Sequence, residues 1–564
     1  MPTHEVTNQV PPLDGYDVAA DPALLDALRR EGGTWGEEEL HELGWLAGSA
    51  RVGEMARLVN DHPPTLRTHD RVGNRIDEVE FHPHWHELMA LAVGHGLHAA
   101  PWRSARPGAH VARAAKFFVW AQAEIGHLCP ISMTYAVVPA LRHHAELAAL
   151  YEPLLASDEY DFGLREPSTK RGLIAGMSMT EKQGGSDVRA NSTTARPAPD
   201  GSWSIVGHKW FTSAPMSDLF LTLAQAPGGL SCFFVPRVLP DGTRNEIRLV
   251  RLKDKLGNRS NASAEIEYEQ ARGWLVGEEG HGVRTIMEMV AVTRLDAMLG
   301  SAAGMRWGSV QAVHYCDHRR AFGALLVDQP LMTNVLADLV VESEAATMLA
   351  MRVAGASDRA AGGHEAEAAF RRLVLPAAKY WLCKRAPVHA AEALECFGGN
   401  GYVEDFGMAR LYREAPVNSV WEGSGNVAAL DVLRAIARNP AVLEAYFAEV
   451  EQAAGADPRL DHAVSRLRKE LGDTEEVGAR ARRVAECLAL VLQGSLLVRH
   501  GHPAVADAFV ASRLDGDWGA ALGTLPASVD VVRIVERARV DRSPERGRPP
   551  TDAGAARPVA GPTS

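Results

Sequence analysis

The spacing of apolar residues changes twice along this chain, and these changes restrict the possible folds more than any single motif does. Residues 21–160 carry apolar side chains at helical intervals. Residues 170–279 instead alternate apolar and polar positions, as at Ala264 and Ile266, which is typical of strands with one buried face. Helical spacing returns in residues 282–540. We therefore predict a mainly α fold with a small β domain between helical regions.

The 564 residues are too many for one small core, and the changes of spacing indicate where domains meet. The predicted parts are an N-terminal helical domain with an extended arm (1–175), a β domain (176–281), a helical bundle (282–440), a C-terminal helical extension (441–540) and a tail (541–564). Pro440 is expected to break the helical run between the bundle and the extension. The tail lacks apolar residues and is predicted to be disordered.

Composition excludes several classes of protein. The net charge of −12 does not fit a chain that binds nucleic acid over its whole surface. Six scattered cysteines without a C-x-x-C pair indicate neither a disulfide framework nor a zinc site, and no metal site is predicted. The N-terminus shows no signal peptide and no apolar run reaches about 18 residues, so we expect a cytoplasmic protein without membrane contact.

A carboxylate flanked by glycines stands near the end of the bundle region. Residues 411–426 read LYREAPVNSVWEGSGN, with Glu422 directly before Gly423. Glycine permits turns that other residues resist, so such a loop lets a carboxylate approach a substrate carbon and offers backbone N–H groups to a cofactor. Upstream, residues 397–402 read FGGNGY. Taken alone, a glutamate in an ordinary turn is the alternative.

Two polar segments mark the β region. Residues 177–188 read MSMTEKQGGSDV and residues 207–214 read GHKWFTSA. The Thr180 hydroxyl can both donate and accept a hydrogen bond, Gly185 lets the backbone approach a phosphate, and Trp210 presents an aromatic face. Taken alone, the first segment is a polar glycine turn and the second a strand with a buried tryptophan.

The order of helical, β and helical regions, with these motifs in that order, resembles the acyl-CoA dehydrogenase family. The resemblance covers roughly residues 75–440 and implies a helical N-terminal domain, a β-barrel-like middle domain, a helical bundle and FAD as cofactor. It places Trp210 against the flavin ring and Thr180 at the polar edge of that ring. The residues expected to contact FAD are Met177, Met179, Thr180, Gly185, Ser186, Trp210, Phe211, Thr212, Ser213, Arg319, Phe322, Gly398, Gly399, Val420, Trp421, Ser424 and Asn426.

Two of these residues are assigned to a neighbouring subunit's flavin. Residues 319–323 read RRAFG, and the resemblance places Arg319 on the pyrophosphate and Phe322 beside the adenine. An exposed basic turn is the alternative for this segment.

Glu422 is the predicted catalytic base. In the family's reaction a carboxylate takes the α-proton of an acyl thioester while the β-hydrogen leaves as hydride to flavin N5. Desolvation beside the flavin and Trp421 would raise the carboxyl pKa toward neutrality, where a base of this kind works best. Some relatives carry the base on an earlier helix, before an arginine, but this chain has Thr293 before Arg294 there. Threonine cannot serve as a carboxylate base.

The resemblance extends further to the AidB branch, the bacterial adaptive-response proteins induced by DNA alkylation. Residues 252–263, LKDKLGNRSNAS, residues 410–426 and the helical extension after Asn439 carry it. It implies a homotetramer, weak isovaleryl-CoA dehydrogenase activity, and binding of double-stranded DNA without sequence specificity through the extension.

The extension is nearly neutral but its positive charges are grouped. Residues 458–540 hold 12 Lys and Arg against 11 Asp and Glu. Grouped cations can bind phosphates nonspecifically, although a solvated helix face is the alternative. No spacing typical of a helix-turn-helix or zinc finger occurs. The candidate DNA contacts are Arg466, Arg468, Lys469, Arg480, Arg482 and Arg483.

Two functions of different classes therefore remain. In the first, a DNA-bound flavoprotein protects the duplex, either by destroying an alkylating agent as its small-molecule substrate or by shielding the DNA. In the second, the chain is a metabolic dehydrogenase of short branched-chain acyl-CoA, and the extension serves assembly.

Overall fold

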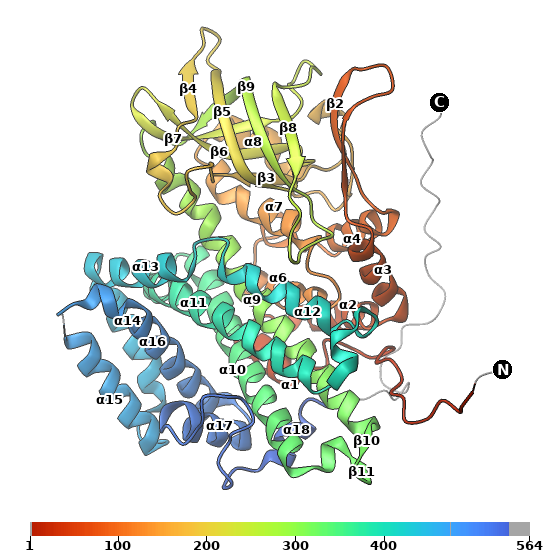
Figure 1. The fold of residues 1–564 in the computed structure, drawn as a ribbon. Helices are drawn as coiled ribbons and strands as arrows, with labels where there is room; N and C mark the ends of the chain where they lie inside the picture. Colours follow the sequence, from red (N-terminus) through yellow and green to blue (C-terminus); the bar gives the residue numbers. More distant parts are fainter. Residues whose placement is uncertain (1–2, 474, 541–564) are drawn as a thin grey trace.

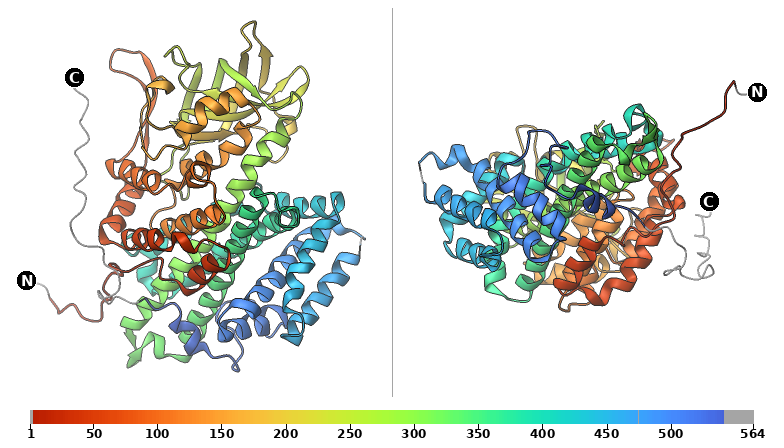
Figure 2. Two further views of the ribbon diagram at one scale, coloured as in Figure 1. Left: turned by 180° about the vertical axis from the view of Figure 1, so that it is seen from behind. Right: turned by 90° about the horizontal axis from the view of Figure 1, so that it is seen from below.

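The computed structural model describes residues 3–473 and 475–540. It confirms the predicted fold class: a β domain stands on a helical bundle, with N-terminal helices on one side of the bundle and the extension on the other (Figures 1 and 2). The tail predicted at residues 541–564 lies outside the described residues.

The N-terminal part contains eight helices and one hairpin among its described residues. The helices are α1 (Pro22–Arg30), α2 (Glu37–Ala47), α3 (Ala50–Asp61), α4 (Pro83–Gly94), α5 (Ala100–Arg103), α6 (Ala109–Ala121), α7 (Leu128–Leu141) and α8 (Ala145–Leu155). All residues of α6 except His110 are buried, as expected of a helix that packs on several sides. Helix α6 contacts α9 and α10 of the bundle, so the core is continuous between these parts.

The hairpin of β1 (Thr65–His69) and β2 (Arg75–Glu80) was not predicted from the sequence. Its strands are short and mostly polar, so they lack a strong apolar alternation. Long-range contacts hold the hairpin against the β domain: Arg75 donates to the Leu249 carbonyl at 3.0 Å, and Arg244 donates to the Ile76 carbonyl at 3.0 Å.

The β domain is one seven-stranded sheet of mixed direction. Its strands are β3 (Ala175–Ser178), β4 (Thr194–Pro197), β5 (Trp203–Ser213), β6 (Leu219–Ala226), β7 (Gly229–Pro236), β8 (Ile247–Leu252) and β9 (Ser263–Val276). Their order is β3-β5-β4-β6-β7-β9-β8, with further pairings of β3 with β6 and of β5 with β9 that curl the sheet. Helices α7 and α8 lie beside this sheet (Figure 1).

The bundle is built on one long helix, α9 (Gly282–His318), which runs from the β domain to the far end of the molecule (Figure 1). The other helices are α10 (Pro330–Ala361), α11 (Glu365–Glu395), α12 (Met408–Glu414) and α13 (Gly425–Arg438). A small hairpin, β10 (Arg320–Ala321) with β11 (Ala324–Leu325), follows α9. None of the described helices is both long and apolar enough to cross a membrane.

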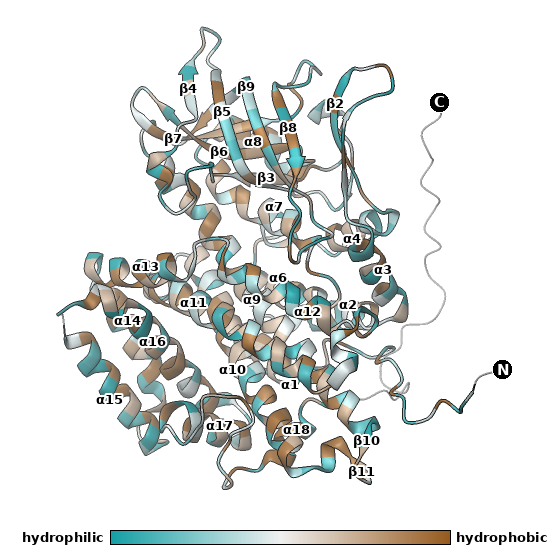
Figure 3. Cartoon of the chain, in the orientation of Figure 1, coloured by the Kyte–Doolittle hydropathy of each residue, from teal (hydrophilic) through white to brown (hydrophobic). Residues whose placement is uncertain are grey.

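The extension packs on the bundle through its central helix. It consists of α14 (Ala441–Val450), α15 (Pro458–Gly472), α16 (Val477–His500), α17 (Pro503–Phe509) and α18 (Val531–Glu536). Helix α16 contacts α10, α11 and α13, whereas α15 lies on the outer side of α16 (Figure 2). Figure 3 shows many hydrophilic residues along α15, which fits this outer position.

Candidate active site

The two polar segments of the β domain lie side by side. The Trp210 backbone N–H donates to the Thr180 carbonyl at 2.8 Å. Ser178 pairs with Thr212 in the sheet, and their hydroxyl oxygens are 2.5 Å apart. Residues 177–180 and 210–213, which were predicted to contact the flavin from two separate segments, therefore form one continuous surface.

The turn after Thr180 folds back on that threonine. A Cβ added to Gly185 would lie 2.4 Å from Thr180 Oγ1, so no larger residue fits there without a shift of the turn. Gly185 and Ser186 are exposed. The Lys253 ammonium lies 3.3 Å from the centre of the Trp210 ring, so a cation covers one face of the indole. A planar cofactor would stack on the opposite face of the Trp210 indole.

A buried ion pair that the sequence analysis missed joins these two segments. Lys209 Nζ donates to Glu181 Oε1 at 2.9 Å, and both side chains have no exposed surface. Glu181 also accepts from the Thr193 backbone N–H at 3.1 Å. The Lys209 charge and these hydrogen bonds hold the pKa of Glu181 far below its usual range, against the effect of burial. Glu181 follows Thr180 and Lys209 precedes Trp210 in the sequence. This adjacency to the predicted flavin segments is the signal that could have identified the pair.

The loop that carries Glu422 is fixed by two cations from the bundle. Lys379 Nζ donates to the carbonyls of Trp421 at 2.8 Å and of Gly423 at 2.6 Å. Arg294 Nε donates to the Glu422 carbonyl at 2.8 Å. Glu422 itself has a φ of +56°, a left-handed conformation that costs a non-glycine residue about 1–3 kcal/mol. The three hydrogen bonds account for how the loop keeps this conformation.

The Glu422 carboxyl is left free by these bonds. Its Oε2 atom is buried without a hydrogen-bond partner among the described residues. Burial raises the carboxyl pKa and Asp296 adds to the rise, while the Thr293 hydroxyl, Lys379 and Arg294 oppose it. Thr293, which occupies the position of the alternative base, thus lies against the carboxyl of Glu422. A carboxyl of raised pKa with one oxygen left without a partner among the described residues is a suitable proton acceptor.

Cys129, which the sequence analysis left unassigned, lies between the β domain and this loop. Helix α7 begins one residue before it. Burial raises the pKa of the Cys129 thiol to about 11; Glu422 adds to the rise, and Lys255 and the Ser213 hydroxyl oppose it. The Ser213 hydroxyl and the Glu422 carboxyl thus both lie within electrostatic range of the Cys129 thiol.

Four of the residues predicted to contact FAD lie far from this site. At 1.5 Å per residue, Arg319 is about 39 Å along α9 from Thr293. Phe322, on the β10–β11 hairpin, is 98% exposed. The loop of Gly398 and Gly399 lies at the same end of α9. Phe397 stacks there on the Tyr315 ring at 4.2 Å between ring centres. We call Arg319, Phe322, Gly398 and Gly399 the remote cluster.

The cations predicted to contact DNA do not form one row. Arg466 donates to the Leu514 carbonyl, and Arg468 pairs with Glu451. Arg480 and Arg483 both pair with Glu470. Lys469 is exposed. The side chain of Arg480 is 23% exposed and also donates to the carbonyls that end α15, whereas that of Arg483 is 71% exposed.

Arg482 points away from the other cations of the extension, toward the Glu422 loop. Its Nε donates to Asn426 Oδ1 at 2.7 Å. With Lys384, Val420 and Ser424 it lines a groove of about 460 Å³ at the start of α13. Arg482 and Lys384 are both exposed, and neither forms an ion pair with any part of the chain that the structure describes. The groove is suited to a phosphate-bearing ligand.

Three family models match successive parts of the chain. The adaptive response protein AidB N-terminal domain matches residues 8–162, the acyl-CoA dehydrogenase middle domain matches residues 176–271, and the acyl-CoA dehydrogenase C-terminal domain matches residues 280–437. The protein AidB of Escherichia coli (strain K12) is 47% identical over 525 residues, which cover 92% of this chain and 96% of that protein. The chain belongs to the AidB branch of the acyl-CoA dehydrogenase family.

Other relatives support this membership. Acyl-CoA dehydrogenase family member 11 of Caenorhabditis elegans is 31% identical over 503 residues, 83% of this chain and 80% of that protein. The crystal structure of Caenorhabditis elegans ACDH-11 in complex with C11-CoA has a TM-score of 0.84 at 29% identity and covers 91% of this chain and 93% of that chain. A Bacillus anthracis acyl-CoA dehydrogenase complexed with FAD shares the fold, with a TM-score of 0.61 at 19% identity over 77% of this chain and 78% of that chain.

The family uses FAD as its cofactor. The residues of this chain fit that group. Thr180, Ser213 and Trp210 are partly exposed and present two hydroxyls and an indole ring, and the groove at Ser424 offers two cations without ion-pair partners among the described residues for phosphates. Glu422 Oε2 is buried and has no hydrogen-bond partner among the described residues.

Proposed function

We propose that Glu422 is the base of an FAD-dependent acyl-CoA dehydrogenation in this protein. The observation that carries the proposal is the buried Oε2 atom without a partner, on a loop whose backbone is held by Arg294 and Lys379. These cations donate to carbonyl oxygens and not to the carboxyl, so they fix its position without occupying its proton-accepting atom.

In the proposed reaction the α-carbon of an acyl thioester loses its proton to Glu422 Oε2. FAD, when bound, accepts the hydride that leaves the β-carbon. Burial around Glu422 destabilises its charged form, which raises its affinity for the proton. The Thr293 hydroxyl and the two cations limit that rise, so that the carboxyl can still ionise before each turnover.

The remote cluster supports a proposed homotetramer. Arg319 and Phe322 are about 39 Å along α9 from the Glu422 region, so they cannot reach the flavin surface of their own chain. Phe322 is nearly fully exposed on its hairpin, so a second copy of the chain could reach it. We propose that a neighbouring subunit presents this cluster to the adenosine half of FAD.

For the extension we propose nonspecific binding of double-stranded DNA and protection of that DNA from alkylating agents. The branch membership and the exposed cations of α15 and α16 support this proposal. Weak dehydrogenation of isovaleryl-CoA belongs to the same proposal. The second candidate is a metabolic dehydrogenase of short branched-chain acyl-CoA without a DNA role, which the free Glu422 carboxyl favours.

A screen of flavin reduction by acyl-CoA thioesters, with and without duplex DNA, tests both candidates. Slow reduction by isovaleryl-CoA together with salt-dependent duplex binding supports the DNA-protecting flavoprotein. Fast turnover of one acyl-CoA without duplex binding supports the metabolic enzyme. A protein that stays colourless after titration with FAD contradicts both.

A further inference from the structure

A buried carboxylate, Asp431, lies behind one of the two cations that hold the Glu422 loop. It belongs to α13, whose other buried residues are glycine, alanine and valine. Asp431 Oδ2 accepts from Arg294 Nη1 at 2.7 Å, and Asp431 Oδ1 accepts from Arg372 Nη2 at 2.7 Å. Burial of a carboxylate among small apolar residues is costly unless its charge is paired. Both oxygens are paired here, so the position of the Asp431 carboxylate is closely defined.

The Arg294 guanidinium joins the Glu422 loop to the helix that follows it. Arg294 lies on α9, and its Nε donates to the Glu422 carbonyl at 2.8 Å while Nη1 donates to Asp431. A Cβ added to Gly423 would lie 3.2 Å from Arg294 Nη2, so the guanidinium also packs on the loop backbone. The loop therefore contacts one part of the guanidinium, and Asp431 fixes another part.

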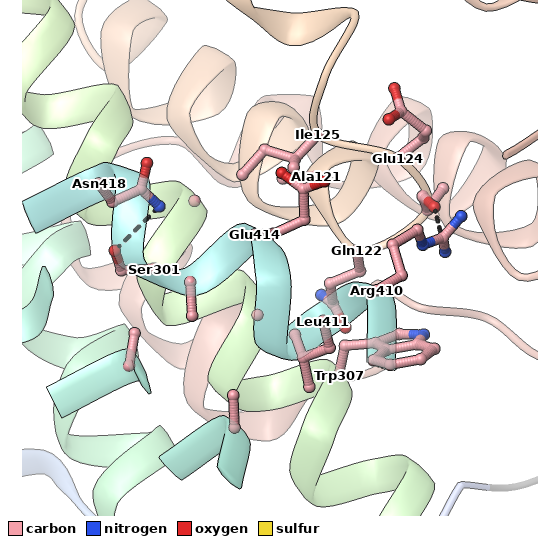
Figure 4. Close-up of a pocket in the computed structure, with 16 residues that line it drawn as sticks. Ala121, Gln122, Glu124, Ile125, Ser301, Trp307, Arg410, Leu411, Glu414 and Asn418 are labelled. Atoms are coloured by element: carbon pink, nitrogen blue, oxygen red, sulfur yellow. Dashed lines mark hydrogen bonds between the residues drawn. The ribbon is translucent and has the colours of Figure 1, made fainter. Parts of the chain in front are cut away.

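The chain before the loop is held by neutral groups instead. The Trp421 indole N–H donates to Asn418 Oδ1 at 3.0 Å, and Asn418 Nδ2 donates to Ser301 Oγ at 3.1 Å. Figure 4 shows the bond between Asn418 and Ser301, which ties this part of the chain to α9. These groups influence where the loop lies, but they add no charge near Glu422.

The two cations of the loop differ in how their charge is compensated. Lys379 donates to two loop carbonyls and forms no ion pair with any residue that the structure describes. Arg294 is paired with Asp431. Burial raises the pKa of the Glu422 carboxyl, and both cations oppose that rise. The charged or titratable groups that influence Glu422 are Lys379, Arg294, Asp296 and Cys129.

Asp431 keeps its negative charge while Glu422 titrates. Against the effect of burial, the hydrogen bonds and charges of Arg372 and Arg294 lower the pKa of the Asp431 carboxyl below its ordinary value, whereas the pKa of Glu422 is raised. Asp431 thus offsets part of the Arg294 charge whenever Glu422 gains or loses a proton. Arg372, whose side chain is 42% exposed, offsets part of the Asp431 charge in turn.

We propose that Asp431 is a positioning residue for the base: it holds the Arg294 guanidinium against the Glu422 backbone and offsets its charge, so that the Glu422 carboxyl keeps its affinity for a proton. The loop needs a cation to hold its carbonyls, and an uncompensated cation there would favour the ionised carboxylate too strongly. Asp431 allows the same arginine to serve the first purpose without the second effect. The proposal rests on the role of Glu422 proposed above.

The test follows the ionisation of Glu422 directly, in the FAD-loaded protein. Infrared spectra recorded against pH contain the carboxyl stretching band of protonated Glu422, which is identified by its loss in Glu422→Gln. Asp431→Asn keeps the shape of the side chain and an oxygen for Arg294, but it removes the charge. We expect the midpoint of the band to move about 0.5–1 pH unit lower. Arg372→Gln should move it higher, and by less, because Arg372 is partly exposed.

Flavin reduction by isovaleryl-CoA gives a second readout. The same shifts should appear in the pH dependence of the stopped-flow rate, and above the midpoint Asp431→Asn should be about 3- to 10-fold slower because the loop is held less firmly. Two changes serve as controls that should leave the midpoint in place. Ser301→Ala removes the acceptor of Asn418 without a change of charge, and Glu54→Gln removes a surface charge beside Arg57.

Shifts of opposite sign in Asp431→Asn and Arg372→Gln support the proposal, because a loss of structure alone would not reverse its direction. An unchanged midpoint in both variants overturns it, as does a shift in Ser301→Ala equal to that in Asp431→Asn. If Asp431→Asn does not fold, the direction of the shift in Arg372→Gln decides. If isovaleryl-CoA does not reduce the flavin, the dehydrogenation proposal fails, while the infrared titration still decides the effect of Asp431 on Glu422.

Discussion

The cations around Glu422 and those of the outer extension are bonded in opposite ways. Lys379 and Arg294 are buried, and they donate to three successive carbonyls of the Glu422 loop. Arg468 and Arg483 are exposed and pair with carboxylates on neighbouring helices. Lys379 and Arg294 are shielded from water, so water screens their hydrogen bonds to the backbone carbonyls only weakly. The second pair is screened by salt and can exchange a carboxylate for a phosphate.

The effect of a positively charged side chain therefore depends on whether it is buried or exposed. In the buried setting, removal of one partner leaves an uncompensated group, so each cation is needed where it stands. In the exposed setting a single bond contributes little, and only a group of cations acts together. The predictions below separate the two regions on this basis.

Removal of the base should have the largest effect. We expect Glu422→Gln to bind FAD normally and to reduce the rate of flavin reduction by acyl-CoA about 10²–10⁴-fold, because the amide keeps the shape and cannot take the proton. Stopped-flow absorbance measures the rate. A variant that reduces its flavin at the unmodified rate would show that another group is the base.

The same rate should depend on pH in a defined direction. Glu422 accepts a proton only when ionised, and its pKa is raised by burial. The rate should therefore fall as pH is lowered through this raised pKa, about tenfold per pH unit below it. The midpoint should lie above that of an ordinary glutamate. A midpoint at or below the ordinary value contradicts the role of burial.

Breaking a buried pair should cost far more stability than breaking an exposed one. Lys209→Met leaves the Glu181 carboxylate buried without its cation, and we expect a loss of about 3–5 kcal/mol in the free energy of unfolding. The matched change Arg468→Met removes an exposed partner of Glu451 and should cost about 0–1 kcal/mol. Urea unfolding monitored by fluorescence gives both values. Equal losses would remove the distinction between buried and exposed cations.

Duplex binding should depend on the exposed cations as a group. Replacing Arg466, Arg468 and Arg483 by alanine should weaken all duplexes alike and lower the slope of log K against log salt by up to about three. Replacing Arg480 alone should change this slope little, because it is bonded to Glu470 and to carbonyls at the end of α15. A triple variant with unchanged affinity and slope would exclude these helices as the DNA contact.

Replacement of Arg482 should have the smallest effect, and it separates FAD binding from duplex binding. It was predicted to contact DNA, but it bonds to Asn426 at the groove beside the Glu422 loop. We expect Arg482→Ala to weaken FAD binding a few-fold while duplex affinity stays unchanged, and Arg483→Ala to do the reverse. Titration of the apoprotein with FAD and of both variants with duplex measures this. The opposite pattern would return Arg482 to the DNA surface.

Local patterns along the chain were sufficient to predict the fold class and the family. Changes of apolar spacing are local, so they indicated the β region that ends with β9 at Val276 and the helical region that begins with α9 at Gly282. The glycines beside Glu422 and Thr180 likewise reflect local backbone demands, which sequence patterns report.

Which of these residues come into contact depends on how distant elements pack, and this could not be predicted from the sequence. The Lys209–Glu181 pair, the hydrogen bond of Arg294 to the Glu422 carbonyl and the groove lined by Arg482 and Ser424 depend on contacts between different elements of the chain. The distance of the remote cluster from Glu422 follows from the length of α9. Arg482 and Arg483 are separated because they lie on different sides of α16. Burial and charge compensation arise from packing in three dimensions, and no local spacing along the chain encodes them.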